Sequence, residues 1–239
     1  MKSRKGLNSI VGFMVLISAF AVLALSRKAS SLTITDSSED EEFTIDQFFI
    51  DEPILVLGDS QVGRNIGKSI IDRFPNNEIH LLYKEGYTPK KFMTDGDMVF
   101  DLANKIGDNK IRNVIVQFGD NGIYGNSRVK ALADYLKELG VENIFWIGSH
   151  VKTVPKGNNS SYVHTSPTSD DDWRFIPRYN DLAKGWNQSM MSDLADVDGV
   201  IFINPFDYYP VGEYDETTAS VDGVHLDKGA SDDFVNSIF

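Results

Sequence analysis

The chain has 239 residues, 41% hydrophobic and 24% charged, which is typical of a globular protein with one substantial core. It contains no cysteine, which excludes disulfide scaffolds, thiolate metal sites and cysteine nucleophiles. The formal net charge of −12 argues against a nucleic-acid partner, because phosphate binding depends on clustered Lys and Arg.

An apolar segment lies close to the N-terminus. Residues 9–26, SIVGFMVLISAFAVLALS, carry no charge, and basic residues precede and follow them. The segment approaches the roughly 20 residues that a membrane-spanning helix needs and exceeds the usual core of a signal peptide. We therefore predict a signal anchor over residues 1–28, with the rest of the chain on the extracytoplasmic side. Cleavage after Ala24-Leu25-Ser26, which would give a secreted protein, stays open as the alternative.

Residues 29–46, ASSLTITDSSEDEEFTID, have the composition of a tether. Five acidic residues fall within the seven positions 36–42. Repulsion between like charges favours a solvated, extended chain. We expect this tether to connect the anchor to a single folded domain over residues 47–239.

Short apolar runs alternate with amphipathic segments from residue 47 onwards. The runs cover 53–58, 78–83, 113–119, 143–149 and 200–205. Their nearly continuous apolar character is typical of strands buried on both faces of a parallel sheet. The helical segments lie near 61–74, 95–107, 126–139, 176–196 and 229–238. This alternation predicts a three-layer α/β domain with a central parallel sheet of about five strands.

Residues with reactive or hydrogen-bonding side chains follow the predicted strands. Ligands of such sheets bind beyond the carboxyl ends of the strands. Ser60 comes directly after the first strand, in LGDSQ. A serine hydroxyl needs an imidazole to accept its proton, and that imidazole needs a carboxylate to orient it. Among the four histidines, His225 alone has a carboxylate three residues before it, Asp222 in VDGVHL. Ser60, His225 and Asp222 are therefore candidates for a catalytic triad; the alternative for Ser60 is a helix cap.

Three strand ends offer hydrogen-bond donors for a developing oxyanion. The Ser60 amide would open a helix, where the first amides lack an intrahelical acceptor. Gly86 follows the second strand, where its backbone can approach a ligand closely or simply form a turn. Asn121 follows the third strand and carries a side-chain amide. Together these residues supply the parts of an acyl-transfer site.

The arrangement resembles that of the SGNH hydrolases, also called GDSL esterases or lipases, which carry four ordered sequence blocks. The matching positions, in order, are Gly58-Asp59-Ser60, Gly86, Gly119-Asp120-Asn121, and Asp222 with His225. The resemblance spans residues 53–239 and implies a flavodoxin-like sheet.

The same resemblance implies a role for each site residue. Ser60 would be the nucleophile, His225 the base and Asp222 its partner. The oxyanion hole would consist of the Ser60 amide, Gly86 and Asn121, and we expect no cofactor and no metal. The family usually has Asp after the third-block Asn, whereas this chain has glycine at residue 122, so another group must orient Asn121.

Several polar features have simpler interpretations. Residues 150–175 form a long irregular stretch, which is usually functional or mobile inside a compact domain. We interpret His150, at its beginning, as a loop residue near the rim of the site rather than a catalyst. The acidic run 170–172 is more typical of a solvated loop than of a cation site. Asn187 lies in an Asn-x-Ser sequon, which matters only in a host that glycosylates.

We therefore predict a serine esterase that works through a covalent acyl-enzyme. The strand-end loops show no long apolar lid, which favours a short acyl group, acetyl above all, on an extracellular or envelope carbohydrate. The expected partners are a small acyl ester or acylated glycan as substrate, and the membrane through the N-terminal helix. Two alternatives stay open: an O-acyltransferase to a glycan, and a non-catalytic glycan-binding surface protein with the same fold.

Overall fold

The computed structural model describes residues 45–49, 51–118, 121, 128–152, 166–172, 174–208 and 222–239. All of them belong to the second of the two units into which the chain divides, Thr44–Phe239. The predicted anchor and nearly all of the predicted tether, residues 1–44, lie outside the described ranges. Among the described residues, no helix is long and apolar enough to cross a bilayer.

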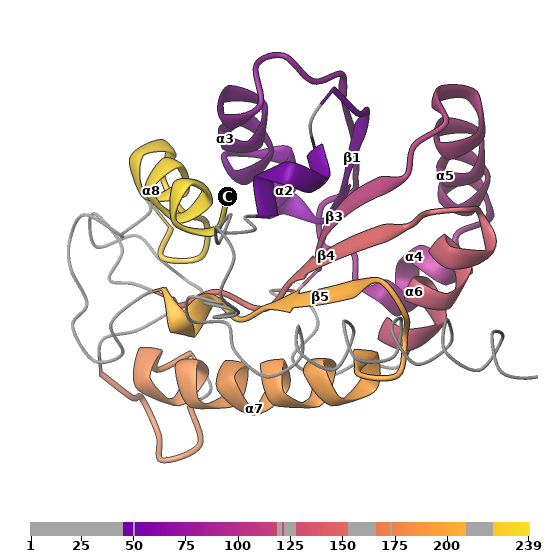
Figure 1. The fold of residues 1–239 in the computed structure, drawn as a ribbon. Helices are drawn as coiled ribbons and strands as arrows, with labels where there is room; N and C mark the ends of the chain where they lie inside the picture. Colours follow the sequence, from indigo (N-terminus) through magenta and orange to yellow (C-terminus); the bar gives the residue numbers. More distant parts are fainter. Residues whose placement is uncertain are drawn as a thin grey trace, which may run out of the picture. The chain divides into compact units, whose positions relative to one another are not determined.

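A five-stranded parallel sheet forms the centre of this unit (Figure 1). The strands are β1 (Ile54–Gly58), β2 (Ile79–Tyr83), β3 (Asn113–Gln117), β4 (Asn143–Ile147) and β5 (Val200–Ile203). Their spatial order, β2-β1-β3-β4-β5, is the flavodoxin-like order of doubly wound sheets. The predicted α/β class, the parallel sheet and the number of strands are confirmed.

The strand order places a topological switch point at the carboxyl ends of β1 and β3, since the chain leaves β1 towards one edge and later returns beside it. Gly58, the last residue of β1, is in register with Tyr83 of β2 and with Gln117 of β3. The three strands therefore end level. Whatever follows them in the sequence starts from the same edge of the sheet.

Helices cover both faces of the sheet, as its alternating side chains require. Leu55 and Leu57 of β1 pack in the apolar cluster on one face, and Ile54 and Val56 pack in the cluster on the other. The first face carries α4 (Pro89–Thr94), α5 (Gly96–Asn109), α6 (Val129–Glu138) and α7 (Ile176–Leu194). The second carries η1 (Ile45–Phe49), α2 (Ser60–Gly63), α3 (Ile66–Arg73) and α8 (Lys228–Ile238). A short 3-10 helix, η2 (Pro205–Asp207), follows β5.

Two details of the helices differ from the sequence prediction. The helix expected over 61–74 is divided at Arg64 and Asn65 into α2 and α3. Helix α4 was not predicted, because its six residues are too few to show a helical period. Its local signal is the Thr88-Pro89 pair: the Thr88 hydroxyl caps the helix by accepting from the Lys91 amide at 3.2 Å, and Pro89 fits the first turn.

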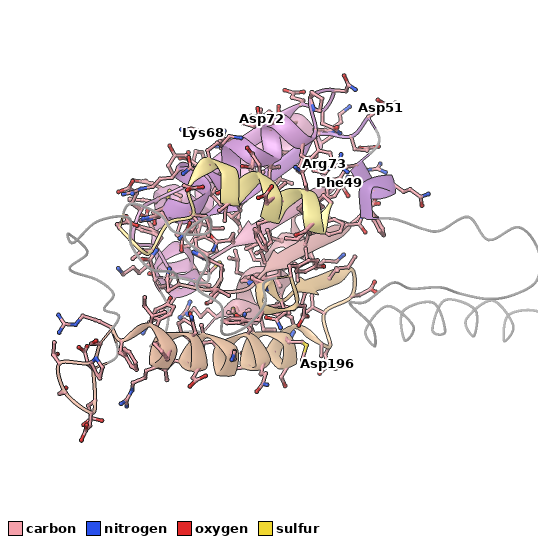
Figure 2. The ribbon with its side chains drawn as sticks, turned by 90° about the vertical axis from the view of Figure 1, so that its left-hand side faces the viewer. Phe49, Asp51, Lys68, Asp72, Arg73 and Asp196 are labelled. Atoms are coloured by element: carbon pink, nitrogen blue, oxygen red, sulfur yellow. The ribbon has the colours of Figure 1, made fainter. Side chains whose placement is uncertain are left out.

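Helix α8 packs beside α3 on one face of the sheet (Figure 1). The Lys228 ammonium at its start lies 2.7 Å from the carboxylate of Asp72, one of the α3 residues labelled in Figure 2. At its other end, the Arg73 guanidinium donates to the carbonyl of Phe239, whose ring packs edge-on against Phe49. This pairing matters for the site, because the segment that precedes α8 carries His225.

Candidate active site

The Gly-Asp-Ser sequence after β1 has a distinct structural role at each position. A Cβ on Gly58 would lie 2.3 Å from the Gln117 carbonyl oxygen of β3, so only glycine fits between the two strands. The Asp59 carboxylate caps α2 by accepting from the Gln61 amide at 3.0 Å. Ser60 is the first residue of α2, and the interpretation of Ser60 as the helix cap is therefore wrong.

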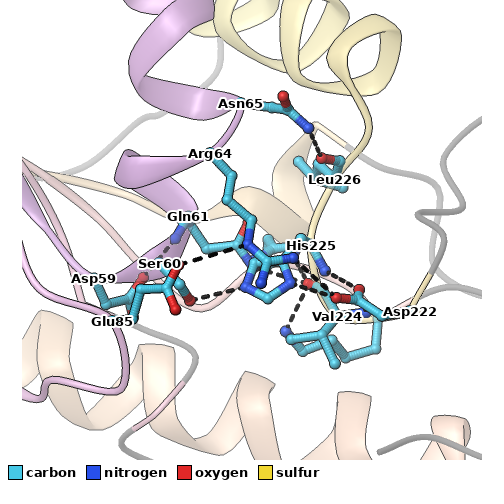
Figure 3. A network of polar contacts seen from close by, with 12 residues as sticks. Asp59, Ser60, Gln61, Arg64, Asn65, Glu85, Asp222, Val224, His225 and Leu226 are labelled. Atoms are coloured by element: carbon cyan, nitrogen blue, oxygen red, sulfur yellow. Dashed lines mark hydrogen bonds and ion pairs between the residues drawn. The ribbon is translucent and has the colours of Figure 1, made fainter. Parts of the chain in front are cut away.

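The structure brings Ser60, His225 and Asp222 together, as predicted (Figure 3). His225 Nε2 lies 2.8 Å from Ser60 Oγ, and His225 Nδ1 lies 2.7 Å from Asp222 Oδ2. A carboxylate can only accept, so Nδ1 carries the proton of the neutral imidazole and Nε2 accepts from the serine hydroxyl. The arrangement can remove the proton from Ser60 as the oxygen attacks.

Asp222 holds its own loop as well as the imidazole. Its Oδ1 accepts from the backbone amides of Val224 and His225, each at 2.9 Å. Its Oδ2 accepts from the Arg64 guanidinium at 3.2 Å in addition to His225. Arg64 Nε in turn lies 4.0 Å from Glu85, on the turn after β2. Four donors thus hold this one carboxylate in place.

Burial lowers the pKa of His225 from its usual value of 6.5, because the imidazolium is poorly solvated there. The hydrogen bond and the charge of Asp222 oppose this shift, whereas the positive charges of Arg64 and Lys152 add to it. The His225 side chain is only 13% exposed. The neutral form, which is the form that can act as a base, is therefore favoured at neutral pH.

Asn121 contacts Asp59, the residue before Ser60, and this contact orients its side-chain amide. Its side-chain amide donates to Asp59 Oδ2 at 3.0 Å, while the other oxygen of the same carboxylate caps α2. Asp59 thus supplies the orienting contact that residue 122 cannot provide. An amide carries two N–H donors, and this bond uses one of them. The neighbouring residues 119, 120 and 122 lie outside the described part of the chain.

Gly86 lies in a tight turn directly after β2. The Tyr87 amide donates to the Lys84 carbonyl at 3.2 Å, and Gly86 has a φ of +72°, which disfavours a side chain. The Lys84 amide donates to the carbonyl of Gly58, which ties the turn to the end of β1. The Lys91 ammonium donates to the Gly86 carbonyl at 2.9 Å. The turn is therefore braced beside the strand that leads to Ser60.

A set of buried polar side chains next to His225 was not identified from the sequence. His150 is 1% exposed rather than a rim residue, and Lys152, two positions further on, is 2% exposed. Both reach the backbone carbonyl of Val224, as does the Gln61 side chain. The only sequence signal for this group is its place after the strands β1 and β4.

Two other candidate sites have structural roles. Asp172 is buried, and its carboxylate accepts from the amides and side chains of Thr168 and Arg174 just before α7. No cluster of acidic or histidine side chains suited to a metal ion occurs in the described part of the chain. Asn187 is also buried, and its amide group bonds both the N–H and the C=O of Ser149. The sequon at Asn187 is therefore inaccessible in the folded chain.

Comparisons with known proteins give no family for this chain. No protein-family model matches it. No curated protein matches it in sequence. Seventeen chains of solved structures match, among them a GDP-L-fucose synthetase from Naegleria fowleri and the same enzyme bound to NADP. Both are 10% identical, with TM-scores of 0.34 and 0.31, and the matches cover 70% and 72% of this chain and 52% and 54% of those chains. The chain thus spans about half of their length.

Proposed function

We propose that the protein is a serine esterase of the SGNH type that hydrolyses short acyl esters, acetyl esters above all, on a carbohydrate. The observation that supports this proposal most directly is the line of two short hydrogen bonds from Asp222 through His225 to Ser60. The membrane-anchored, extracytoplasmic location remains a prediction from residues 1–28.

The reaction proceeds in two acyl transfers. Ser60 Oγ attacks the ester carbonyl carbon while His225 Nε2 takes the hydroxyl proton. The tetrahedral intermediate expels the alcohol, which receives that proton from His225, and the acyl group stays on Ser60. A water molecule then loses a proton to His225 and attacks the acyl carbon, which releases the acid and returns the proton to Ser60.

The negative charge on the carbonyl oxygen needs donors during both transfers. The Ser60 amide, as the first of α2, lacks an intrahelical acceptor, and Asn121 lies beside Asp59 with its amide group. The turn that carries Gly86 is tied to the end of β1. These three positions are the oxyanion donors in this proposal.

The polar surroundings of Ser60 favour a hydrophilic substrate. Arg64 and Glu85 lie at the site with side chains 46% and 67% exposed, and Asn121 is also exposed. In Figure 3, Glu85 lies beside Ser60, and the Arg64 side chain extends across the site towards Asp222. A long fatty chain would gain little from such a rim, because covering these charged side chains would remove them from water at a cost in free energy. A sugar hydroxyl that carries a small acyl group suits these contacts better.

A fluorophosphonate probe tests the proposal without requiring the natural substrate. The probe should form a phosphonyl ester on Ser60, located by peptide mass spectrometry, and the protein should hydrolyse p-nitrophenyl acetate. Prior labelling should abolish that hydrolysis. Labelling of a different serine, or turnover that survives complete labelling, would contradict the proposal.

Asn121→Ala is expected to lower kcat for p-nitrophenyl acetate by about a hundred- to a thousandfold, the usual cost of removing one oxyanion donor. KM should change little, because the amide acts mainly on charge that develops in the transition state. Asn109→Ala on α5 is the matched control and should leave kcat unchanged. A fall of less than about threefold in the Asn121 variant would remove this residue from the oxyanion hole.

The acidic limb of the pH profile should reflect the lowered pKa of His225. Because the base must be neutral, kcat/KM falls as the pH drops through the pKa of His225. Burial lowers this pKa below 6.5, so activity should persist to lower pH than an unperturbed histidine would allow. Measuring kcat/KM between about pH 5 and pH 8 locates the midpoint. A midpoint above 6.5 would mean that the Asp222 contact outweighs burial.

A further inference from the structure

Three side-chain nitrogens lie within hydrogen-bond distance of the backbone carbonyl of Val224, the residue before His225. The Val224 oxygen accepts from Gln61 Nε2 at 2.8 Å and from Lys152 Nζ at 3.0 Å. His150 Nε2 lies 2.8 Å from the same oxygen. A carbonyl oxygen has two lone pairs, so three partners more than fill its capacity.

The Val224 carbonyl determines which ring nitrogen of His150 carries hydrogen. The Val224 oxygen can only accept, so a nitrogen 2.8 Å away must carry a proton. Gln61 Nε2 lies 3.3 Å from this His150 nitrogen. Gln61 Nε2 and His150 Nε2 therefore both donate to the Val224 oxygen, and this shared acceptor explains why the two nitrogens lie so close.

The cation in this cluster is buried, which is uncommon for lysine. The Lys152 backbone is tied to α7, because its amide donates to Asn180 Oδ1 at 2.9 Å and its carbonyl accepts from Asn180 Nδ2 at 3.2 Å. Its ammonium lies 5.2 Å from the centre of the Tyr179 ring. Desolvating an ammonium costs free energy that these contacts offset only with good geometry. The backbone of this buried lysine is thus fixed to α7, and its ammonium bonds the carbonyl of Val224, the residue before His225.

The Val224 carbonyl belongs to the peptide group that joins Val224 to His225. The N–H of this peptide donates to Asp222 Oδ1 at 2.9 Å, while its C=O receives the three donors. Both sides of the peptide plane are therefore fixed. Rotation of this plane would carry the His225 ring away from Ser60.

We propose that Lys152 is a positioning residue of the esterase, which holds the Val224 carbonyl and through it keeps the His225 ring in line with Ser60. Gln61 and His150 complete the support from α2 and from the end of β4. This inference rests on the proposed function, since it assigns His225 the role of base.

Lys152 also acts on His225 through its charge. Three charged groups act on the pKa of His225: Asp222 raises it, whereas Arg64 and Lys152 lower it. His150 contacts the carbonyl of the preceding residue, Val224. Removing the Lys152 charge should therefore raise the pKa of His225. A lysine that only filled space would leave this pKa unchanged.

The experiment compares three substitutions at one position. Lys152→Met removes the donor and the charge, Lys152→Gln keeps a donor without charge, and Lys152→Arg keeps both. We expect Lys152→Met to lower kcat for p-nitrophenyl acetate by about ten- to a hundredfold, with KM nearly unchanged, as for misplacement of a catalytic group. Its acidic limb should move to higher pH, and Lys152→Arg should restore much of kcat and the wild-type limb. Lys130→Met, on the exposed face of α6, is the matched control and should behave as wild type.

A nuclear magnetic resonance titration of the His225 imidazole reports its pKa without any turnover. If the wild type hydrolyses the ester but Lys152→Met keeps the wild-type kcat and the wild-type His225 pKa, the positioning role is refuted. If the wild type neither turns over nor reacts with fluorophosphonate, the proposed function fails, and the titration still tests the contact with Lys152. Should Lys152→Met lose its circular-dichroism signal, Lys152→Gln tests the loss of the charge alone. A rise in the His225 pKa is then the expected result, and an unchanged pKa is the refutation.

Discussion

Ser60→Ala is expected to lower kcat for p-nitrophenyl acetate by about four to six orders of magnitude, down to the residual rate supplied by binding and the oxyanion donors. In the proposed mechanism the Ser60 hydroxyl, 2.8 Å from His225 Nε2, forms the acyl-enzyme, and alanine removes it. The variant should also fail to react with a fluorophosphonate probe. Alanine is a good helix former, so α2 should persist.

Ser189→Ala, on the exposed side of α7, is the matched control for the Ser60 variant. It makes the same chemical change far from the site and should leave both kcat and labelling intact. Equal turnover by Ser60→Ala and the wild type would end the esterase assignment. A common loss in both variants would point to unfolding, which a thermal melt of each protein detects.

Asp222→Asn is expected to lower kcat by about ten-thousandfold. The asparagine oxygen can still accept from the amides of Val224 and His225, so the loop should keep its shape. An amide nitrogen would then face His225 Nδ1, and two donors cannot bond. The imidazole would move its proton to Nε2, and that nitrogen could no longer accept from Ser60.

The loss of the Arg64 contact is a minor part of this effect. Arg64 is 46% exposed, and an exposed ion pair contributes only about 0–1 kcal/mol. Asp181→Asn, an exposed position on α7 with a lysine partner, provides the matched control and should keep the wild-type kcat. A decrease of less than about tenfold in Asp222→Asn would show that the carboxylate is not needed to set the tautomer.

The strands were the easiest part of the fold to predict, because strands buried on both faces carry continuous apolar runs that need no knowledge of distant residues. The break between α2 and α3 was not predicted. At this break, the Arg64 side chain reaches Asp222, and the Asn65 side chain donates to the Leu226 carbonyl at 2.8 Å (Figure 3). The reason for the break is thus a contact with a segment about 160 residues away, which no local pattern records.

In the site, too, some residues could be predicted from the sequence and others depend on contacts between distant segments. Ser60, Asp222 and His225 could be predicted because a serine nucleophile needs an imidazole base and that base needs a carboxylate. Asp222 and His225 also lie only three residues apart in the sequence. Lys152 and His150 act through a backbone carbonyl, which any residue at position 224 would provide. Their contacts join positions 72 and 74 residues apart. Sequence reasoning from chemistry finds groups that react and misses groups that hold the backbone.

Under the proposed mechanism, the pairing of α8 with α3 makes activity depend on a single C-terminal helix. Ser60 and His225 are 165 positions apart, and the segment that carries the imidazole leads directly into α8. Movement of α8 away from α3 would withdraw His225 from Ser60 even where the five strands kept their pairing. Hydrolysis would then be lost at a lower denaturant concentration than the one that unfolds the sheet. The rate of hydrolysis would report on the docking of the C-terminal helix and not on the unfolding of the core.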